Sequence, residues 1–402
     1  MDWIKDPNKL AYFLWLYGPA GSGKSAIAQT IAEMCHAAGL LAASFFFSRT
    51  VTGRNEKARL VSTIVYQMLL VVPEIREQVI SAVEFNPQIF NLSLQTQVQE
   101  LIIGPLTFAL NALSGDEKQK EAFLSRPRLI IIDGLDECID TEAQSYILEV
   151  LIPAVQNAMI PLVFFVASRP EQQIRDAFNE DLLSSLTNTL VLDDTYHPDE
   201  DIRILLDSKF TTIKKKHPAR AHISKEWPSE KDINQLVNKS SGQFIYTTTV
   251  IKYIESRRHL PTERLQIVLG LSDPGNDTPF AELDALYNHI LASTYDQEKV
   301  LKLFMVLLVT DIQKKASVIE KFLFFKPGEI DIILSDLHSL IAVPSPDDDK
   351  SPLRISHASL SDFLRDRSRS GRFFIDAGPA HAEILIYILQ HLLEDKGKFI
   401  QS

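Results

Sequence analysis

The feature that most constrains the fold is the segment from Gly18 to Ser25, GPAGSGKS, which has the spacing of a phosphate-binding loop. Residues 11–17 before it form an apolar, aromatic-rich run with the length of a buried strand. After it, apolar residues recur at helical spacing from Ser25 to Ala38. A flexible glycine turn is the alternative interpretation, but a strand before and a helix after favour a phosphate site in an α/β fold.

Each part of this loop suits a phosphate ligand. Its glycines let the backbone N–H groups turn inward around a phosphate, and the helix start adds the positive end of its dipole. Lys24 supplies a point charge, and the Ser25 hydroxyl can be offered to Mg²⁺. The predicted ligand is therefore a nucleotide phosphate with Mg²⁺. The residues predicted to bind them are Gly18, Pro19, Ala20, Gly21, Ser22, Gly23, Lys24 and Ser25.

A second apolar run, residues 128–132, leads into the carboxylate cluster DGLDE at residues 133–137. Ligands of open parallel sheets bind beyond the carboxyl ends of the strands, so we expect Asp133 to bind the Mg²⁺ ion. Glu137 is predicted to orient and polarise an attacking water. A hydrolase needs a second carboxylate as the base for that water, whereas a nucleotide kinase must exclude water and usually has no acidic residue at this position. For Asp136, a catalytic role and a place in a solvated loop both stay open.

Together these segments resemble the NACHT family of signal-transducing ATPases, and more closely its fungal members, which overlap with nephrocystin-like N-terminal modules. The resemblance extends to residues 45–48 (FFFS), to the helix at 60–69 and to the strand at 163–170. In the family this last strand ends in an arginine that senses the γ-phosphate, so the resemblance implies that Arg169 is the sensor. Ala167 stands where the family has threonine, but a guanidinium binds phosphate oxygens without that hydroxyl.

Composition narrows the alternatives. The chain has 402 residues, 45% of them hydrophobic and 23% charged, as expected for two or three packed units of a soluble protein. A net charge of -11 disfavours a broad nucleic-acid surface. Cys35 and Cys138 are too few for a disulfide framework or a four-ligand zinc site. Because the apolar stretches are too short for a membrane span, we expect a cytoplasmic protein without membrane or nucleic-acid partners.

Strand-like runs alternate with helices up to about residue 195, which predicts a P-loop NTPase domain over 1–195 with a parallel five-stranded sheet. The periodicity is helical from there on, which predicts a helical subdomain over 196–270. A polar, turn-rich segment at 271–277 marks the next boundary. The expected strands are Tyr12 to Tyr17, Ala42 to Phe47, Leu129 to Asp133, Leu162 to Ser168 and Thr189 to Asp193.

Residues 271–375 predict a winged-helix-like subdomain, and residues 376–402 the start of a further helical region. The pattern is a helix at 330–340 followed by two short strand-like runs that a polar stretch joins. Acidic residues such as Asp331 occupy that helix, where a DNA-binding winged helix needs basic ones.

The resemblance also implies two nucleotide contacts from this part of the chain. The segment 240–246 is similar to a glycine-containing turn whose relatives often place a proline against the adenine. Phe244 stands in its place, so both an adenine contact and core packing stay open for that ring. His357 is similar to a histidine that touches the nucleotide diphosphate in the closed state, and a satisfied structural histidine is the alternative.

The sequence as a whole predicts an ATP-binding and hydrolysing switch that closes on ADP and opens or self-associates on ATP. A nucleotide-dependent scaffold with negligible turnover and a small-molecule P-loop kinase are the alternatives. Relatives in the family carry an N-terminal effector and C-terminal sensor repeats, and this sequence predicts neither. We expect either a fragment or truncated gene product, or effector and sensor partners that are separate proteins.

Overall fold

The computed structural model describes residues 2–6, 9–49, 51–113, 115–124, 129–156, 162–271, 278–310, 312–335, 337, 340–342, 352–355 and 357–400. Side chains are described at all of these except 194, 342, 358 and 394–400. By its internal contacts the chain divides into two units. The first unit comprises residues 1–18 and 24–192, and the second comprises residues 19–23 and 193–402. Each unit is described by itself.

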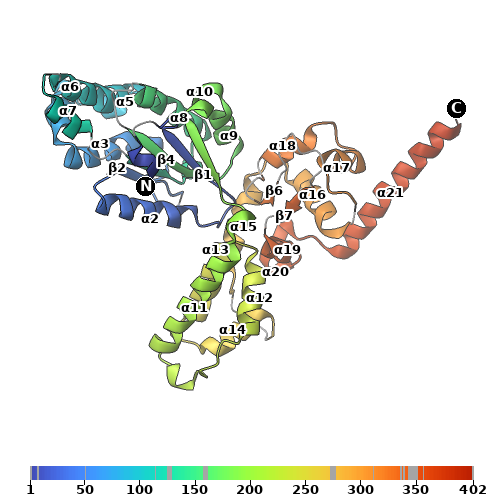
Figure 1. Ribbon diagram of the computed structural model, residues 1–402. Helices are drawn as coiled ribbons and strands as arrows, with labels where there is room; N and C mark the ends of the chain where they lie inside the picture. The colour runs from blue at the N-terminus through green and yellow to red at the C-terminus, as the bar shows by residue number, and fades with distance from the viewer. Residues whose placement is uncertain are drawn as a thin grey trace. The chain divides into compact units, whose positions relative to one another are not determined.

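The first unit is built on a five-stranded parallel sheet with the strand order β2-β3-β4-β1-β5 (Figure 1). This confirms the predicted α/β fold with a parallel five-stranded sheet. The largest difference from prediction is at the edge strand β5, which begins and ends two residues earlier than expected. The strands are β1 (Phe13–Tyr17), β2 (Leu41–Phe46), β3 (Leu129–Asp133), β4 (Val163–Ser168) and β5 (Thr187–Val191).

Helices cover both faces of this sheet, and Figure 1 shows α2 on one side and α5 and α8 on the other. Between α5 and α6 the chain makes the π-helical turn η4 (Gln99–Ile103). The α-helices of the first unit are α1 (Asp2–Lys5), α2 (Lys24–Ala37), α3 (Leu60–Val71), α4 (Arg76–Phe85), α5 (Leu94–Val98), α6 (Gly104–Ala112), α7 (Glu117–Leu124), α8 (Thr141–Gln156), α9 (Gln172–Asn179) and α10 (Asp181–Ser185).

Side chains of the central strands alternate between two apolar layers. In β3, Ile130 and Ile132 belong to the core formed with α3, α5 and α8, whereas Leu129 and Ile131 belong to the core formed with α2. Burial on both faces explains why β3 reads as one continuous apolar run. Asp133 shares the parity of Leu129 and Ile131, so the pleat directs it to the side of the sheet that α2 covers.

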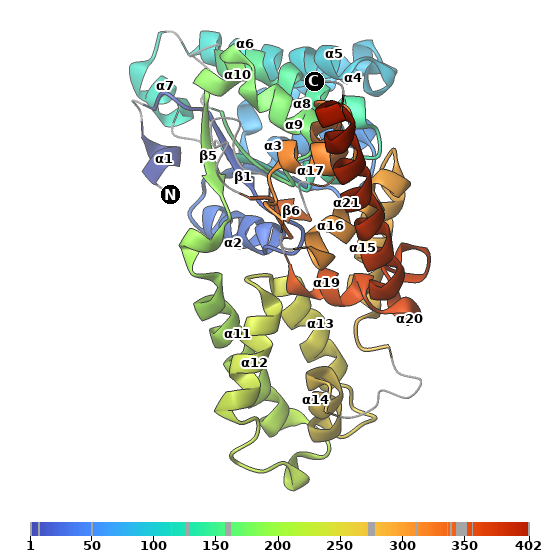
Figure 2. The same cartoon turned by 90° about the vertical axis from the view of Figure 1, so that its right-hand side faces the viewer.

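The second unit is mainly helical, and a single apolar core extends from α11 to α21. Figure 2 shows the group α11 to α14, whose successive helices pack on one another. The helices are α11 (Pro198–Lys216), α12 (Glu230–Ser240), α13 (Phe244–Ile254), α14 (Pro261–Leu269), α15 (Ala281–Ser293), α16 (Gln297–Val309), α17 (Ala316–Phe322), α18 (Glu329–Ser335), α19 (Ala358–Leu364), α20 (Arg367–Ser370) and α21 (Ala377–Ile400).

Two short strands of the second unit, β6 (Ile341–Ala342) and β7 (Arg354–Ile355), pair in antiparallel fashion. This is the pairing that the predicted wing requires. The helix before them, α18, ends at Ser335 and is shorter than the predicted helix at 330–340. Most of the predicted boundary at 271–277 lies outside the described residues, as do Val343 and Ser356 at the ends of the predicted wing strands.

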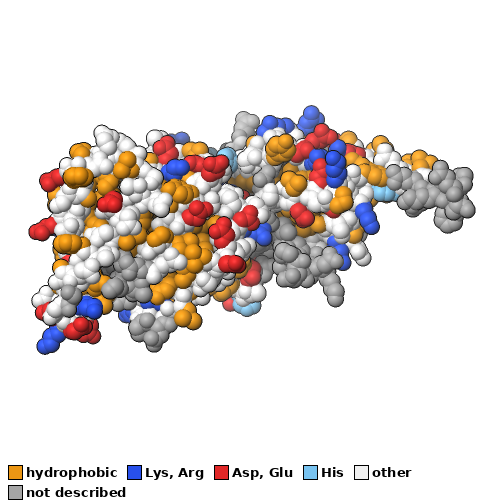
Figure 3. Space-filling model, turned by 90° about the horizontal axis from the view of Figure 1, so that it is seen from above, with side chains coloured by type: hydrophobic (Ala, Val, Ile, Leu, Met, Phe, Trp, Pro, Cys, Tyr) orange, Lys and Arg blue, Asp and Glu red, His pale blue; other side chains and the backbone are white. Residues whose placement is uncertain are grey.

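Helix α21 carries a broad apolar surface on its exposed side, part of which is visible in Figure 3 beside the grey end of the helix. Among the described residues, no single helix is long and apolar enough to cross a membrane, although the sharply bent helix pair Lys57–Val71 and Pro73–Phe85 passes by joint length and composition. The large apolar side chains exposed on α21 are Leu385, Ile386, Ile388, Leu389, Leu392 and Leu393.

Candidate functional site

The predicted phosphate-binding loop connects the end of β1 to the start of α2. Gly21 and Gly23 have φ values of 80° and 91°, which place both in the left-handed region that glycine adopts without strain. The half-buried Lys24 donates a hydrogen bond from Nζ to the Gly18 carbonyl, at 2.8 Å. The lysine side chain therefore folds back along the loop, where a phosphate held by the backbone N–H groups would meet it.

Residues 19–23 of this loop group with the second unit by their contacts. There the Gly21 carbonyl accepts the backbone N–H of Ile245 at 3.3 Å, and a Cβ on Gly21 would lie 2.2 Å from Ile245 Cγ2. A Cβ on Gly23 would lie 3.5 Å from a ring carbon of Phe244. The N-terminal turn of α13 thus packs on the glycines, and side chains larger than hydrogen are excluded at Gly21.

Asp133 is the last residue of β3 and is only 3% exposed. The Ser25 hydroxyl hydrogen-bonds to its carboxylate, whereas Oδ1 is buried and has no hydrogen-bond partner among the described residues. Burial raises the pKa of Asp133 to about 6; the Ser25 hydrogen bond opposes the rise and the Asp136 charge adds to it. A buried carboxylate oxygen without a partner costs free energy, and a cation bound there would remove that cost.

Ser25 and Asp133 together fit a magnesium site. Mg²⁺ prefers oxygen ligands and is usually held by one or two carboxylates together with substrate phosphates and water. The Ser25 hydroxyl and the partnerless Asp133 oxygen, from the two residues predicted to hold the ion, are oxygen groups of this kind. The donor set therefore fits an ion that arrives with a nucleotide.

Asp136 directs both of its carboxylate oxygens at Arg169. Oδ1 accepts the Arg169 backbone N–H at 2.9 Å, and Oδ2 lies 3.2 Å from Nε of the guanidinium. The side chains are 3% and 12% exposed, so water screens this pair weakly. Arg169 follows β4, the neighbour of β3 in the sheet. Asp136 therefore fixes the direction of the predicted sensor arginine.

Lys24 belongs to the same electrostatic group. Burial lowers its pKa to about 8; the Asp136 charge opposes this effect and the Arg169 charge adds to it. Asp133 acts on Lys24 in the same sense as Asp136. Two cations and two carboxylates are thus close enough to influence one another, and we call Lys24, Asp133, Asp136 and Arg169 the charged cluster.

Glu137, the predicted base, is half-buried and is held by a residue that the sequence interpretation missed. Its Oε2 accepts the backbone N–H of Arg49 at 3.0 Å, and Arg49 Nη2 donates to the Asp136 carbonyl at 2.7 Å. Arg49 follows the carboxyl end of β2, which is next to β3. A basic residue just beyond that strand end was the available signal, because ligands of parallel sheets bind there.

Gly134 makes the turn from Asp133 to the short helix η5 (Leu135–Glu137). Its φ is 69°, in the left-handed region. A Cβ at this position would lie 3.3 Å from the Phe47 carbonyl oxygen and 3.7 Å from the Glu137 carboxyl carbon. Glycine is therefore required both for the backbone conformation and for the approach of the segment that follows β2.

His357, the predicted contact for a diphosphate, lies in the second unit at the N-terminus of α19 and is 2% exposed. Nδ1 accepts the Ser359 backbone N–H at 3.1 Å and lies 2.9 Å from the Tyr287 hydroxyl. Nε2 is buried without a hydrogen bond of good geometry in the described part of the chain. Burial lowers the pKa of His357 to about 4, and a weak hydrogen bond to the Ser240 backbone acts in the opposite direction. The ring is therefore neutral at pH 7.

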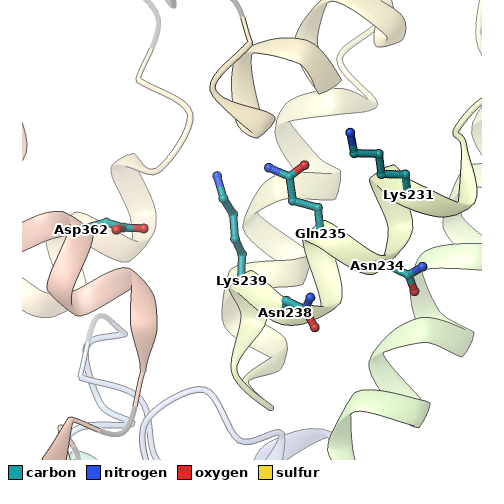
Figure 4. Close-up of a pocket in the computed structure, with 6 residues that line it drawn as sticks. All are labelled: Lys231, Asn234, Gln235, Asn238, Lys239 and Asp362. Carbon is teal, nitrogen blue, oxygen red and sulfur yellow. The ribbon is translucent and has the colours of Figure 1, made fainter.

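A separate polar pocket of about 500 Å³ lies along α12 in the second unit (Figure 4). Two of its side chains already bind the end of α14, since Lys239 and Gln235 both donate to backbone carbonyls there, at 3.3 Å. The sequence predicted no function for this pocket, and its contacts assign none. The lining residues are Lys231, Asn234, Gln235, Asn238, Lys239 and Asp362.

Comparison with known protein families gives one match. Residues 1–169 match the family described as Nephrocystin 3, N-terminal. No curated protein matches the chain. The sheet, the loop between β1 and α2, and the carboxylate that ends β3 define the chain as a P-loop NTPase-like protein.

Two solved structures are similar to the chain at a low level. The ORC2 protein of Aeropyrum pernix, in ADPNP and ADP complexes, is 12% identical with a TM-score of 0.41, and the match covers 95% of this chain and 89% of that chain. Drosophila ORC bound to DNA is 12% identical with a TM-score of 0.38, over 88% of this chain and 89% of that chain. TM-scores this low carry no argument about function.

Proposed function

We propose that this chain is an ATP-binding switch that hydrolyses ATP slowly, closes on ADP, and opens or self-associates on ATP. The observation that carries the proposal is the buried, partnerless oxygen of Asp133 beside Ser25, at the strand end that parallel sheets use for ligands. The match of residues 1–169 to the nephrocystin 3 N-terminal family supports it. So does the resemblance to the fungal NACHT ATPases.

The loop from Gly18 to Ser25 is proposed to hold the nucleotide phosphates through its backbone N–H groups and Lys24. Mg²⁺, when bound, neutralises charge on the phosphate oxygens, and Ser25 and Asp133 are the residues that would hold it. Arg169 adds a second cation, in a direction that Asp136 fixes. Positive charge at the γ-phosphate is the main help that a protein gives to phosphoryl transfer.

Glu137 is proposed as the general base for the attacking water. One of its oxygens is held by the Arg49 backbone N–H, which orients the side chain and leaves a carboxylate that can accept a proton. Asp136 is proposed to act through Arg169 and not on water, because both of its oxygens are engaged there. Two adjacent acidic residues thus receive different roles.

The finer parts of the proposal rest on the family resemblance. His357 is proposed to contact the ADP diphosphate in the closed state, and ATP to promote self-association. Separate effector and sensor proteins would be its partners. The net charge of -11 favours partners other than nucleic acid, and we expect the protein to act in the cytoplasm.

The test is to identify the nucleotide that copurifies with the protein, and then to measure phosphate release from ATP without any acceptor. Glu137→Gln should retain ATP binding and slow release about a hundred- to ten-thousand-fold, because an amide cannot accept the proton. Glu142→Gln, which neutralises an exposed carboxylate in the first turn of α8, is the matched control and should leave the rate unchanged.

The outcomes separate the alternatives. Tight ATP binding with negligible phosphate release in the parent protein would indicate the nucleotide-dependent scaffold. Transfer that appears only when a small-molecule acceptor is added would indicate the kinase. Undiminished phosphate release in Glu137→Gln would mean that another group activates the attacking water.

A further inference from the structure

A buried hydrogen-bonded group surrounds one nitrogen of His357 in the second unit. The Tyr287 hydroxyl lies 2.9 Å from Nδ1 and 2.8 Å from the Ser359 hydroxyl, and that hydroxyl also contacts Nδ1 directly. All three side chains are at most 3% exposed. We call Tyr287, His357 and Ser359 the neutral cluster. It joins α15 to the first residues of α19 across 70 residues of sequence.

The direction of one of these hydrogen bonds is fixed by chemistry. A backbone N–H can only donate, so the bond from the Ser359 N–H to Nδ1 requires a free electron pair on Nδ1. In a neutral imidazole the proton must then be on Nε2. The two hydroxyls complete the arrangement if Tyr287 donates to Ser359 and Ser359 donates to Nδ1, which leaves no hydroxyl proton without an acceptor.

The other nitrogen faces a different environment. Nε2 is buried and has no hydrogen bond of good geometry among the described residues, and the Ser240 backbone at the end of α12 acts on the ring as a weak acceptor that raises its pKa. A buried N–H with so weak a partner costs free energy, so Nε2 is available to a better acceptor. Ring orientation and proton position together determine where that single donor points.

We propose that Tyr287 and Ser359 are positioning residues that hold His357 as the Nε2-protonated neutral tautomer, with its only N–H available to an acceptor such as a phosphate oxygen. The identity of the acceptor as ADP rests on the proposed function. The fixed tautomer does not, because its geometry lies entirely within the second unit. Residues of this kind orient histidines in many sites through the nitrogen that does not touch the ligand.

The direct test is the tautomer itself, read from the ¹⁵N chemical shifts of histidine-labelled full-length protein without nucleotide, with His357→Asn to assign the signals. The parent should show one neutral tautomer with the proton on Nε2. Tyr287→Phe combined with Ser359→Ala should weaken this preference and show a larger share of the other tautomer, because only the backbone N–H of residue 359 then holds Nδ1. Tyr246→Phe is the matched control, because Tyr246 is a buried phenol 6.0 Å from the His357 ring centroid whose hydroxyl has no described partner.

The second measurement is ADP release by stopped flow on the same variants. Removing the orienting hydrogen bond should speed release about two- to tenfold in Tyr287→Phe, the range for one neutral hydrogen bond, and leave Tyr246→Phe unchanged. The positioning role would be overturned if the ¹⁵N shifts of the parent showed the proton on Nδ1. It would also be overturned if the ratio of the two tautomers were the same in the parent and in the Tyr287→Phe, Ser359→Ala variant. The expected tautomer with no ADP binding would overturn only the proposed ligand.

Discussion

The charged cluster of the first unit and the neutral cluster of the second are both buried, but burial leaves their side chains in different ionisation states. Burial disfavours charge in both. In the neutral cluster it lowers the pKa of His357 to about 4 and raises that of Tyr287, so that both groups stay uncharged. In the charged cluster, Asp133 and Lys24 have pKa values of about 6 and about 8. The difference teaches that the charged cluster offers a charged ligand opposite charges, whereas the neutral cluster offers it a single uncharged N–H.

The strongest way to break this comparison is to remove the lysine. Lys24→Ala should weaken ATP binding by about 2 to 5 kcal/mol, or tens- to thousands-fold in Kd, because it deletes one partner of a charge-assisted phosphate contact. Titration calorimetry with Mg²⁺–ATP would measure the change, with Lys239→Ala in the second unit as a matched control. Equal affinities for the parent and Lys24→Ala would remove the loop from the proposed site.

The next effect concerns stability without ligand. The raised pKa of Asp133 means that the folded protein binds more protons than the unfolded chain between about pH 4 and 6, so its contribution to stability falls as the pH rises through that window. Asn does not ionise, and Asp133→Asn should therefore raise the free energy of unfolding by about 2 to 3 kcal/mol at pH 7.5.

Calorimetric melting in metal-free buffer between pH 4.5 and 7.5 would show this gain shrinking toward the acid end. Added Mg²⁺–ATP should stabilise the parent more than the variant, because the ion replaces the missing partner of Asp133. A variant that melts below the parent at pH 7.5 would mean that the carboxylate is already satisfied.

A smaller effect should appear in the pH dependence of binding. Since burial lowers the Lys24 pKa to about 8, binding a phosphate above that pH requires proton uptake. ATP affinity should therefore fall by up to about tenfold per pH unit between pH 8 and 9.5. Fluorescence titration of the parent against Lys24→Met would measure it, and the variant should show little slope. A flat profile in the parent would place the Lys24 pKa well above this range.

The smallest expected effect is an absence of change. With a pKa of about 4, His357 stays neutral from pH 6 to 8, so the ratio of ADP release rates between His357→Asn and the parent should be constant over that range. Its contribution to stability should be lost only as the pH falls from about 6.5 toward 4, because the folded protein binds fewer protons there than the unfolded chain. A ratio that grows between pH 7 and 6 would show that the imidazole acts as a cation.

The parts of the charged cluster that the sequence predicted are those with local signals. The loop is a contiguous motif between a strand and a helix, and Asp133 ends an apolar run that is buried on both faces of the sheet. The edge strand β5 was displaced by two residues because its sequence, TNTLV, is half polar and partly exposed. Helix α18 was predicted too long because the apolar pattern of 330–340 continues past its end at Ser335.

Two of the missed residues, Arg49 and Tyr287, depend on contacts across long stretches of sequence. Arg49 reaches Glu137 and the Asp136 backbone from 88 and 87 residues away, respectively. Tyr287 is 70 residues from His357 and reads in the sequence as one more aromatic residue of an amphipathic helix. No periodicity distinguishes a core tyrosine from one whose hydroxyl orients a histidine, since that distinction exists only once the helices have packed.

The backbone conformation of Gly134 limits which amino-acid substitutions this position can accept. Replacing it by alanine changes no charge and adds a single methyl group, yet that methyl would meet the Phe47 carbonyl oxygen at 3.3 Å in a backbone conformation that alanine rarely adopts. Asp133 precedes this glycine, and Asp136 and Glu137 follow it on the same short turn. Alanine at this position looks conservative but would shift Asp133, Asp136 and Glu137 together. Tolerance to substitution should therefore be low at Gly134, although it carries no functional group.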